Sequence, residues 1–174
     1  VGYYVKEGRL EGILKENSKE MTWYPCCFPK KLNTFVSSPL IESRYLGLYT
    51  YLWKFKGMLR WAYGLYTEKP LNNISYKPKK WQAGDMFFVY PGKDMEIMHS
   101  VREKNMLFAI QDFNIFKKLE KQGVDVENYL REKMEIKLLA GVGDKEPSLE
   151  IDEYKDYEYY KRIRDELIRS FYEK

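Results

Sequence analysis

The sequence predicts an α/β fold with four parallel strands followed by extra C-terminal helices, which is about half of a (β/α)8 TIM-type barrel, with a small open sheet as the alternative. Short apolar runs alternate with helical patterns, which is typical of strands joined by crossover helices. The runs are nearly all apolar or aromatic, as strands buried on both faces are. The chain has 174 residues, whereas a complete barrel usually takes about 250.

Each element follows from its own local pattern. Apolar spacing at Ile41, Tyr45, Leu48 and Leu52 indicates an amphipathic helix, with Ser38 as its N-cap and Pro39 at its first position. The strands are expected at 2–5, 21–27, 58–64 and 86–90. Further helices are expected at 10–19, at about 101–121, after an Asp125 cap, and from near Asp152, with Tyr160, Ile163, Leu167 and Phe171 on one face.

Composition narrows the class of function. The chain has sixteen tyrosines and four tryptophans, which are typical of partly buried, partly solvated surfaces such as carbohydrate sites and interfaces. The alternative is that they simply fill a Tyr-rich core and surface. The 30 basic and 26 acidic residues are mixed along the chain, which favours a solvated surface over a nucleic-acid-binding stripe. No apolar run is long enough to cross a bilayer, and no signal peptide is evident. We therefore expect a soluble chain with no membrane or nucleic-acid partner, and we assign it no compartment.

The cysteine and histidine content argues against several chemistries. Cys26 and Cys27 are adjacent, so they form neither a disulfide framework nor a zinc motif. His99 is the single histidine, and we interpret it as an ordinary loop residue. No Gly-rich nucleotide loop follows any predicted strand. We expect no metal and no cofactor.

Several motifs stand together in a fixed order: "WYPCCFP", "SPLIESRYLGLYTYLWKFKGMLRWAYGLY", "WQAGDMFFVYPG" and the "SVR…IQDF" helix. With them, essentially the whole chain resembles the C-terminal half of the catalytic domain of glycoside hydrolase family 123, the β-N-acetylgalactosaminidase-like barrels. The resemblance implies the C-terminal half of a (β/α)8 TIM-type barrel, in which the four predicted strands match strands five to eight. The chain departs from the family pattern in two places. His99-Ser100-Val101-Arg102 stands for the family's Ser-Ser-Ile-Arg, and Ala109 stands for a glycine.

The resemblance implies substrate-assisted hydrolysis of N-acetylhexosaminides, most naturally a β-N-acetylgalactosaminide, in which the sugar's own acetamido oxygen attacks the anomeric carbon. The family's adjacent Asp-Glu pair ends the fourth barrel strand and is expected upstream of Val1, so no catalytic residue is assigned in this chain. The adjacent carboxylates that are present, Asp152-Glu153 and Asp165-Glu166, follow no strand. The resemblance therefore implies little or no activity for this chain alone.

Residues that contact sugar are expected at the carboxyl ends of the strands. Alternation places Leu59, Trp61 and Tyr63 on one side of their strand. Trp61 is predicted to provide the flat surface on which a sugar ring stacks, and packing in a barrel core is the alternative. Tyr63 is predicted to offer its hydroxyl to the acetamido group or the sugar.

Further candidates are weaker. Tyr24 and Cys26 share one side of an earlier strand end. Tyr90 ends a strand that Pro91-Gly92 terminates, and the sequence leaves open whether it binds sugar or packs at the rim. Asp85 precedes its strand, so we expect it at the opposite face, in a structural turn.

A half-barrel exposes unpaired edges and an apolar inner face. We expect a single domain over 1–174, with a helical tail over 122–174 packed on it, and pairing with the missing N-terminal half or self-association as a dimer. A second interpretation is a non-catalytic carbohydrate-binding or assembly module with an aromatic rim. A third is an unrelated small α/β protein whose aromatics lie in its core.

Overall fold

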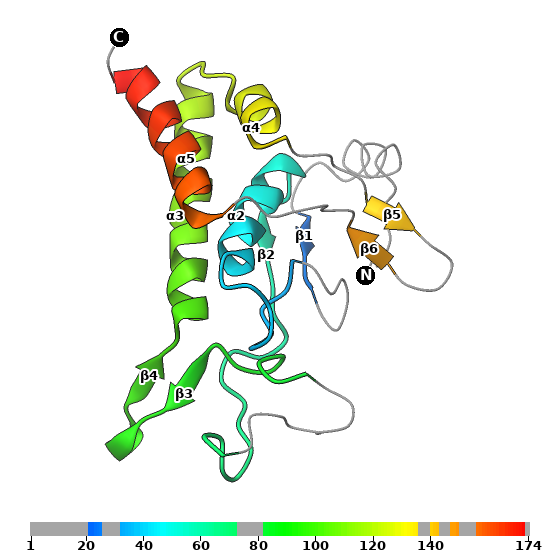
Figure 1. The fold of residues 1–174 in the computed structure, drawn as a ribbon, viewed down its shortest axis with the longest axis vertical. Coiled ribbons are helices and arrows are strands. Elements are labelled where there is room, and N and C mark those ends of the chain that lie inside the picture. The colour runs from blue at the N-terminus through cyan, green and yellow to red at the C-terminus, as the bar shows by residue number, and fades with distance from the viewer. Residues whose placement is uncertain are drawn as a thin grey trace.

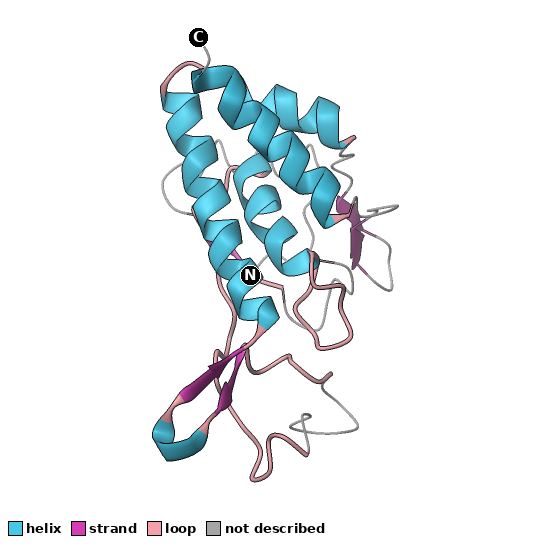
Figure 2. Cartoon of the chain, turned by 60° about the vertical axis from the view of Figure 1, so that its left-hand side comes forward, coloured by secondary structure: helices cyan, strands magenta, loops and turns pink. Residues whose placement is uncertain are grey.

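A computed structural model of the chain describes residues 21–25, 32–72, 82–135, 140–142, 147–149 and 156–172. The elements predicted at 2–5 and 10–19, together with Cys26 and Asp152, lie outside these residues. The helices α2 (Glu42–Leu52), α3 (Val101–Lys121), α4 (Val126–Met134) and α5 (Tyr157–Tyr172) gather at one end, and a hairpin projects from the other (Figures 1 and 2).

Helix α2 lies at the centre of the core. The predicted apolar positions Tyr45, Leu48 and Leu52 are buried in the main hydrophobic cluster, as expected. The predicted amphipathic character is wrong, because every residue of α2 except Gly47 is buried. The predicted start was wrong: Ile41 occupies the N-cap, and the segment from Ser38 forms a turn instead of a first helical turn. Gly47 lets α3 approach closely, since an added Cβ would clash with the backbone carbonyl of Ala109. A larger side chain there would force the two helices apart.

Helices α3, α4 and α5 complete the cluster. The predicted bounds of α3 are confirmed, and the Ser100 hydroxyl caps it by accepting from the amide of Glu103 at 3.1 Å. The Asp125 cap of α4 is also confirmed, with its carboxylate accepting from the amide of Asn128 at 3.3 Å. Helix α5 buries the predicted face, and the buried members of that face are Tyr160, Ile163 and Leu167.

The predicted four-stranded parallel sheet is not seen in the described part of the chain, where only two-stranded sheets occur. Strand β1 (Thr22–Trp23) pairs in parallel with β2 (Gly57–Met58), and α2 forms the crossover between them. This unit confirms the predicted strand–helix–strand order. The predicted strand 58–64 nevertheless ends at Met58.

The segment after β2 turns to run antiparallel to a later segment. Gly64 bridges Phe87 in antiparallel fashion, and the amide of Phe88 donates to the carbonyl of Tyr63 at 2.8 Å. Strand β3 (Val89–Pro91) pairs antiparallel with β4 (Ile97–His99) across a 3-10 turn at Lys93–Met95. The prediction that 86–90 is a parallel strand was therefore wrong. β5 (Ala140–Val142) and β6 (Pro147–Leu149) form another antiparallel pair.

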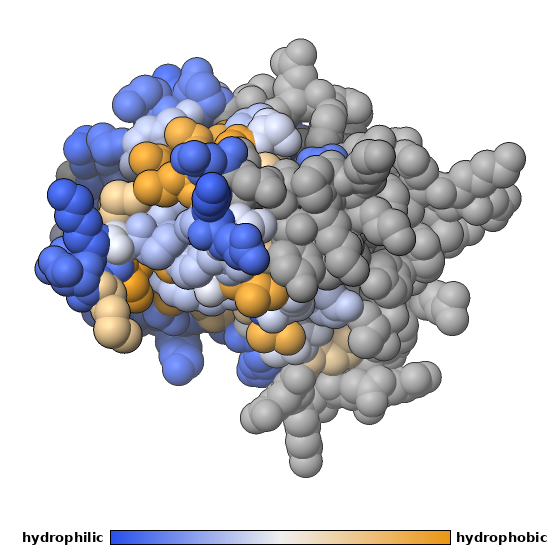
Figure 3. All heavy atoms as spheres, turned by 90° about the horizontal axis from the view of Figure 1, so that it is seen from below, coloured by the Kyte–Doolittle hydropathy of each residue, from blue (hydrophilic) through white to orange (hydrophobic). Residues whose placement is uncertain are grey.

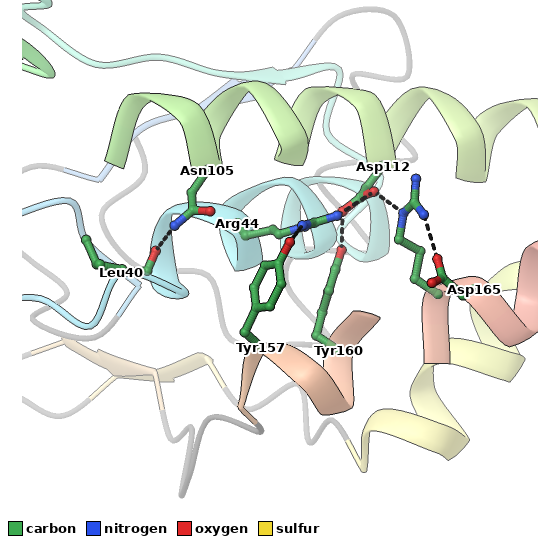
Figure 4. Close-up of polar contacts among 8 residues, drawn as sticks. Leu40, Arg44, Asn105, Asp112, Tyr157, Tyr160 and Asp165 are labelled. Carbon is green, nitrogen blue, oxygen red and sulfur yellow. Dashed lines mark hydrogen bonds and ion pairs between the residues drawn. The ribbon is translucent and has the colours of Figure 1, made fainter. Parts of the chain in front are cut away.

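One buried ionic cluster ties three helices together (Figure 4). Asp112 of α3 is fully buried and accepts from Arg44 Nε of α2 at 2.8 Å and from Arg164 Nε of α5 at 2.5 Å. The Tyr160 hydroxyl donates to the same carboxylate at 2.9 Å. Burial works against the charge of Arg44, but its hydrogen bond to Asp112 and the charge of Asp112 raise its pKa overall. Because every oxygen here is bonded, the cluster can stabilise the helix packing despite its burial.

Candidate functional site

The "LRWAYG" segment exposes one side and hides the other, as its alternation predicts. Leu59, Trp61 and Tyr63 are 58%, 43% and 54% exposed, while Arg60 and Ala62 are half-buried. Trp61 is therefore not part of the core formed by the described residues. The exposed fraction of Trp61 is large for an indole and leaves ring surface open to solvent.

A buried carboxylate anchors Trp61. The indole Nε1–H donates to Asp85 at 2.9 Å, and the guanidinium of Arg60 pairs with the other oxygen of Asp85, also at 2.9 Å. Arg60 in turn donates to the carbonyl of Pro25 at 2.5 Å, just beyond β1. The side chains of Arg60 and Asp85 are each only 4% exposed. A charge-assisted pair so shielded from water holds the indole in one orientation.

The structure corrects the predicted position of Asp85. We expected it in a turn on the face opposite Trp61, and the turn itself is present at 83–84. Its carboxylate instead contacts the indole of Trp61. Residues 63–65 pair antiparallel with 86–88, so Asp85 lies at the end of this pair where residue 65 is, and not at the opposite end. The contact with Trp61 is made in addition by the side chains, where the chain bends at Trp61 and Tyr63.

Tyr63 belongs to a second polar group, which we call the Glu103 cluster: Tyr63, His99 and Glu103. The Tyr63 hydroxyl donates to Oε1 of Glu103 at 2.9 Å, and His99 Nδ1 lies 2.8 Å from Oε2. Partial burial, and then the hydrogen bond and charge of Glu103, raise the pKa of Tyr63. His99 is therefore not an ordinary loop residue, because it ends β4 and is bonded to the first turn of α3.

Aromatic rings lie behind the Glu103 cluster. The rings of Tyr63 and Phe88 are 5.9 Å apart, and those of Phe87 and Tyr90 are 5.1 Å apart. The guanidinium of Arg102 lies 5.4 Å from the centre of the Phe87 ring. Burial lowers the pKa of Arg102, and the nearby Tyr90 hydroxyl opposes that shift. The ring of the exposed Tyr63 therefore packs against Phe88, while Phe87, Tyr90 and Arg102 form a separate group.

The remaining predicted residues lie as follows. Tyr90 is half-buried and within β3, so it does not end a strand at a barrel rim as predicted; Pro91-Gly92 leads into the hairpin. Tyr24 is half-buried immediately after β1. Viewed from the hairpin end, the described surface carries apolar side chains in separate patches among hydrophilic ones (Figure 3).

The described residues hold no group of three or more His, Cys, Asp or Glu side chains placed to bind a metal ion. Of the helices in those same ranges, none is both long enough and apolar enough to span a bilayer. Asp165 sits within α5 and pairs with Arg164 at 2.8 Å. Its neighbour Glu166 accepts from the Tyr129 hydroxyl at 3.5 Å. None of these bonds connects Asp165 or Glu166 to Trp61 or Tyr63.

This fold and these motifs define a class of protein. The model of the glycoside hydrolase 123 catalytic domain matches residues 4–119, and the chain belongs to that family. A solved family 123 glycoside hydrolase from Clostridium perfringens, studied for glycolipid glycan hydrolysis, superposes with a TM-score of 0.70 at 21% identity. The superposition covers 97% of this chain and 31% of that enzyme, so the chain spans about a third of its length. Comparison with curated proteins finds no match.

The structure adds functional candidates that the sequence did not suggest. Asp85 is the partner of Trp61, and Glu103 is the partner of both Tyr63 and His99. One signal for Glu103 was available, because Ser100-x-x-Glu103 has the form of a capping box. Nothing in the sequence indicated that its carboxylate would face Tyr63.

Proposed function

We propose that this chain forms the sugar-contacting part of a family 123 domain that hydrolyses N-acetylhexosaminides, most naturally a β-N-acetylgalactosaminide, by the substrate-assisted route. The observation that carries the proposal is the exposed Trp61 ring, held by a buried Arg60–Asp85 pair within a family 123 chain. A flat apolar face that cannot rotate freely is what stacking on a pyranose requires. Tyr63 supplies a hydroxyl two residues away on the same side of the segment.

The same proposal gives the chain little or no activity by itself. The carboxylates beside Trp61 and Tyr63 are Asp85 and Glu103, and each already accepts from two side chains. A general acid must be free to give a proton to the leaving oxygen. In our proposal the Asp-Glu pair comes from the remainder of a family 123 catalytic domain, in a longer chain or a second polypeptide. These occupied carboxylates also favour our second candidate, a carbohydrate-binding or assembly module without catalysis.

A binding experiment tests the proposal. N-acetylgalactosamine is titrated into the chain and followed by saturation-transfer NMR, for wild type, Trp61→Ala and Leu59→Ala. Leu59 is the matched control because it is exposed on the same side of the segment but is not aromatic. Stacking between aromatic rings is worth about 0.5–1.5 kcal/mol, and by analogy Trp61→Ala should weaken binding roughly 2- to 12-fold while Leu59→Ala leaves it unchanged. Absence of binding by wild type, or equal affinity in both variants, would overturn the proposal.

Hydrolysis separates the two candidate functions. The chain is mixed with a family 123 fragment carrying the Asp-Glu pair, and release from a chromogenic β-N-acetylgalactosaminide is followed. Activity that appears only in the mixture, and falls with Trp61→Ala, supports a contributing part of the enzyme. Sugar binding with no activity in the mixture supports the non-catalytic module.

A further inference from the structure

The β3–β4 hairpin projects away from the helices (Figure 1), and its second strand presents apolar side chains to solvent. Ile97 and Met98 of β4 are 56% and 43% exposed, and Met95 in the preceding turn is 98% exposed. A hairpin of two strands is only marginally stable by itself in water. Natural proteins often protect an open strand edge with lysine or proline, and β4 contains neither. Its edge therefore has the character of an interface.

The hydrogen bonds of the hairpin determine which backbone groups of β4 face outward. The amide of Gly92 donates to the carbonyl of Glu96 at 2.8 Å, so the backbone of Glu96 faces β3. Because alternate residues of an antiparallel strand face the same neighbour, the backbone of Met98 also faces β3. The amides and carbonyls of Ile97 and His99 then point away from β3. Outside the β3–β4 ladder, neither residue has a backbone hydrogen bond within the described part of the chain.

The extended run around β4 is symmetric about Met98. Glu96 (φ −69°, ψ 161°) and Ser100 (φ −98°, ψ 159°) are both extended, so the run covers residues 96–100. It ends on one side at Met95, whose φ is 66°, and on the other side at the start of α3. A second copy placed antiparallel with Met98 opposite itself therefore uses the whole run. A register shifted by two residues in either direction loses one of the two hydrogen-bonded pairs that this register forms.

We propose that β4 pairs with β4 of a second copy of this chain, antiparallel and with a two-fold axis at Met98, to form a symmetric dimer. Ile97 and the partner subunit's His99 exchange both backbone hydrogen bonds, and the symmetry repeats this pair on the other side of the axis. Glu96 lies opposite the partner subunit's Ser100, so no like charges face each other. This self-complementary register is what favours a second copy over an unrelated extended peptide. One short strand buries little area, so the dimer forms only at higher protein concentration.

Charge swaps at Met98 test the two-fold axis. Met98 and its symmetry mate form a pair without hydrogen bonds, where side chains of opposite strands come closest. Met98→Lys and Met98→Glu should each be monomeric, because like charges meet at the axis, while an equimolar mixture of the two should form a heterodimer. Sedimentation velocity over a series of protein concentrations measures the association.

Met95 provides the matched control for these charge swaps. It is more exposed than Met98, but its left-handed conformation places it outside the extended run. Met95→Lys and Met95→Glu should each dimerise as wild type does, because neither charge meets its own copy. Mixing these two variants should give no additional association.

Ile97→Pro tests the backbone contacts. The Ile97 amide faces outward, so its loss deletes no bond to β3, and Glu96 already has the extended conformation that a residue before proline prefers. The variant should unfold in urea as wild type does. It should dimerise roughly 5- to 150-fold more weakly, since two hydrogen bonds are lost per dimer. Ile97→Val keeps the amide and a β-branched side chain, and should retain the dimer.

Three results would overturn the inference. The first is a wild-type chain that stays monomeric at every concentration, which would leave the β4 edge to a different partner. The second is a mixture of Met98→Lys and Met98→Glu that associates no better than either variant alone. The third is an Ile97→Pro variant that dimerises as tightly as wild type, which would place the interface elsewhere on the molecule.

Discussion

Asp112 and Glu103 are carboxylates of the same helix, and each accepts a tyrosine hydroxyl at 2.9 Å. Asp112 is fully buried among Arg44, Arg164 and Tyr160. The Glu103 side chain is 17% exposed and its partners Tyr63 and His99 are more than half exposed. The same bond therefore occurs once inside the helical core and once at the surface beside the hairpin.

The comparison separates support of the fold from recognition. At Asp112 two guanidinium groups and a phenol satisfy a charge that would otherwise be very costly to bury. At Glu103 solvent competes for each partner, so the bonds contribute little to stability. What those bonds do achieve is orientation, since they decide which atoms of Tyr63 and His99 face outward. The carboxylate with the larger effect on stability is thus Asp112 in the middle of α3, and not Glu103 in its first turn beside the candidate site.

The largest expected effect is at the buried carboxylate. Asp112→Asn removes the counter-charge of Arg44, whose side chain is 6% exposed, and breaking a buried pair costs about 3–5 kcal/mol. Urea denaturation followed by circular dichroism measures this loss. The matched control is Asp165→Asn, which breaks a pair whose side chains are 22% and 31% exposed and should cost at most about 1 kcal/mol. Equal losses in the two variants would contradict the distinction between a fully buried ion pair and a partly exposed one.

Much of the helical part was predictable from local signals. The bounds of α3, the Asp125 cap and the buried face of α5 follow from side-chain spacing and capping residues, which lie within one or two turns of each other. The start of α2 was missed because Ser38-Pro39 opens a turn as readily as a helix. Local chemistry left that choice open.

Strand direction was not predictable in the same way. Apolar composition indicates burial, and buried strands can pair in either direction. Pro91-Gly92 signals a turn without saying whether the chain leaves the sheet or returns along it, and here it returns as β4. The non-glycine residues Asp94 and Met95 take up left-handed conformations in that turn, which no pattern in the sequence indicated.

The candidate site was predictable only on one side of each contact. The alternation of side chains correctly predicted that Trp61 and Tyr63 lie on the same side of their segment, and that side is exposed. Alternation depends only on neighbours in the chain. Their partners Asp85 and Glu103 lie 24 and 40 residues farther along. Such contacts depend on how segments distant in the chain come together, which no local pattern determines.

A smaller effect is expected when the two tyrosine hydroxyls are removed. Tyr160→Phe deletes a buried hydrogen bond to a charged group and should cost about 1.5 kcal/mol. Tyr63→Phe deletes a bond of the same length at the surface and should stay within about 0.5 kcal/mol. Thermal and urea unfolding of both variants provide the measurement. A Tyr63→Phe variant as unstable as Tyr160→Phe would mean that the Glu103 cluster supports the fold and not recognition.

The smallest expected effect is on the unfolding free energy in alkaline solution. Burial, and then the charge of Asp112, raise the pKa of Tyr160 well above the ordinary value of 10.0, while Arg44 opposes them. Above pH 10 the unfolded chain therefore loses this proton before the folded chain does, so stability that is fully present below pH 10 is lost as the pH rises. The slope is about 1.4 kcal/mol per pH unit for each such tyrosine.

Unfolding free energies measured between about pH 9 and 11 should fall less steeply in Tyr160→Phe than in wild type, by up to that slope. Tyr63→Phe is the control, and its curve should stay closer to wild type because the Tyr63 hydroxyl is exposed to solvent. Lysines titrate in the same range, but they are common to all three proteins and cancel in the differences. A Tyr160→Phe curve parallel to that of wild type would contradict this prediction. It would mean that the Tyr160 hydroxyl ionises at the same pH in the folded and in the unfolded chain.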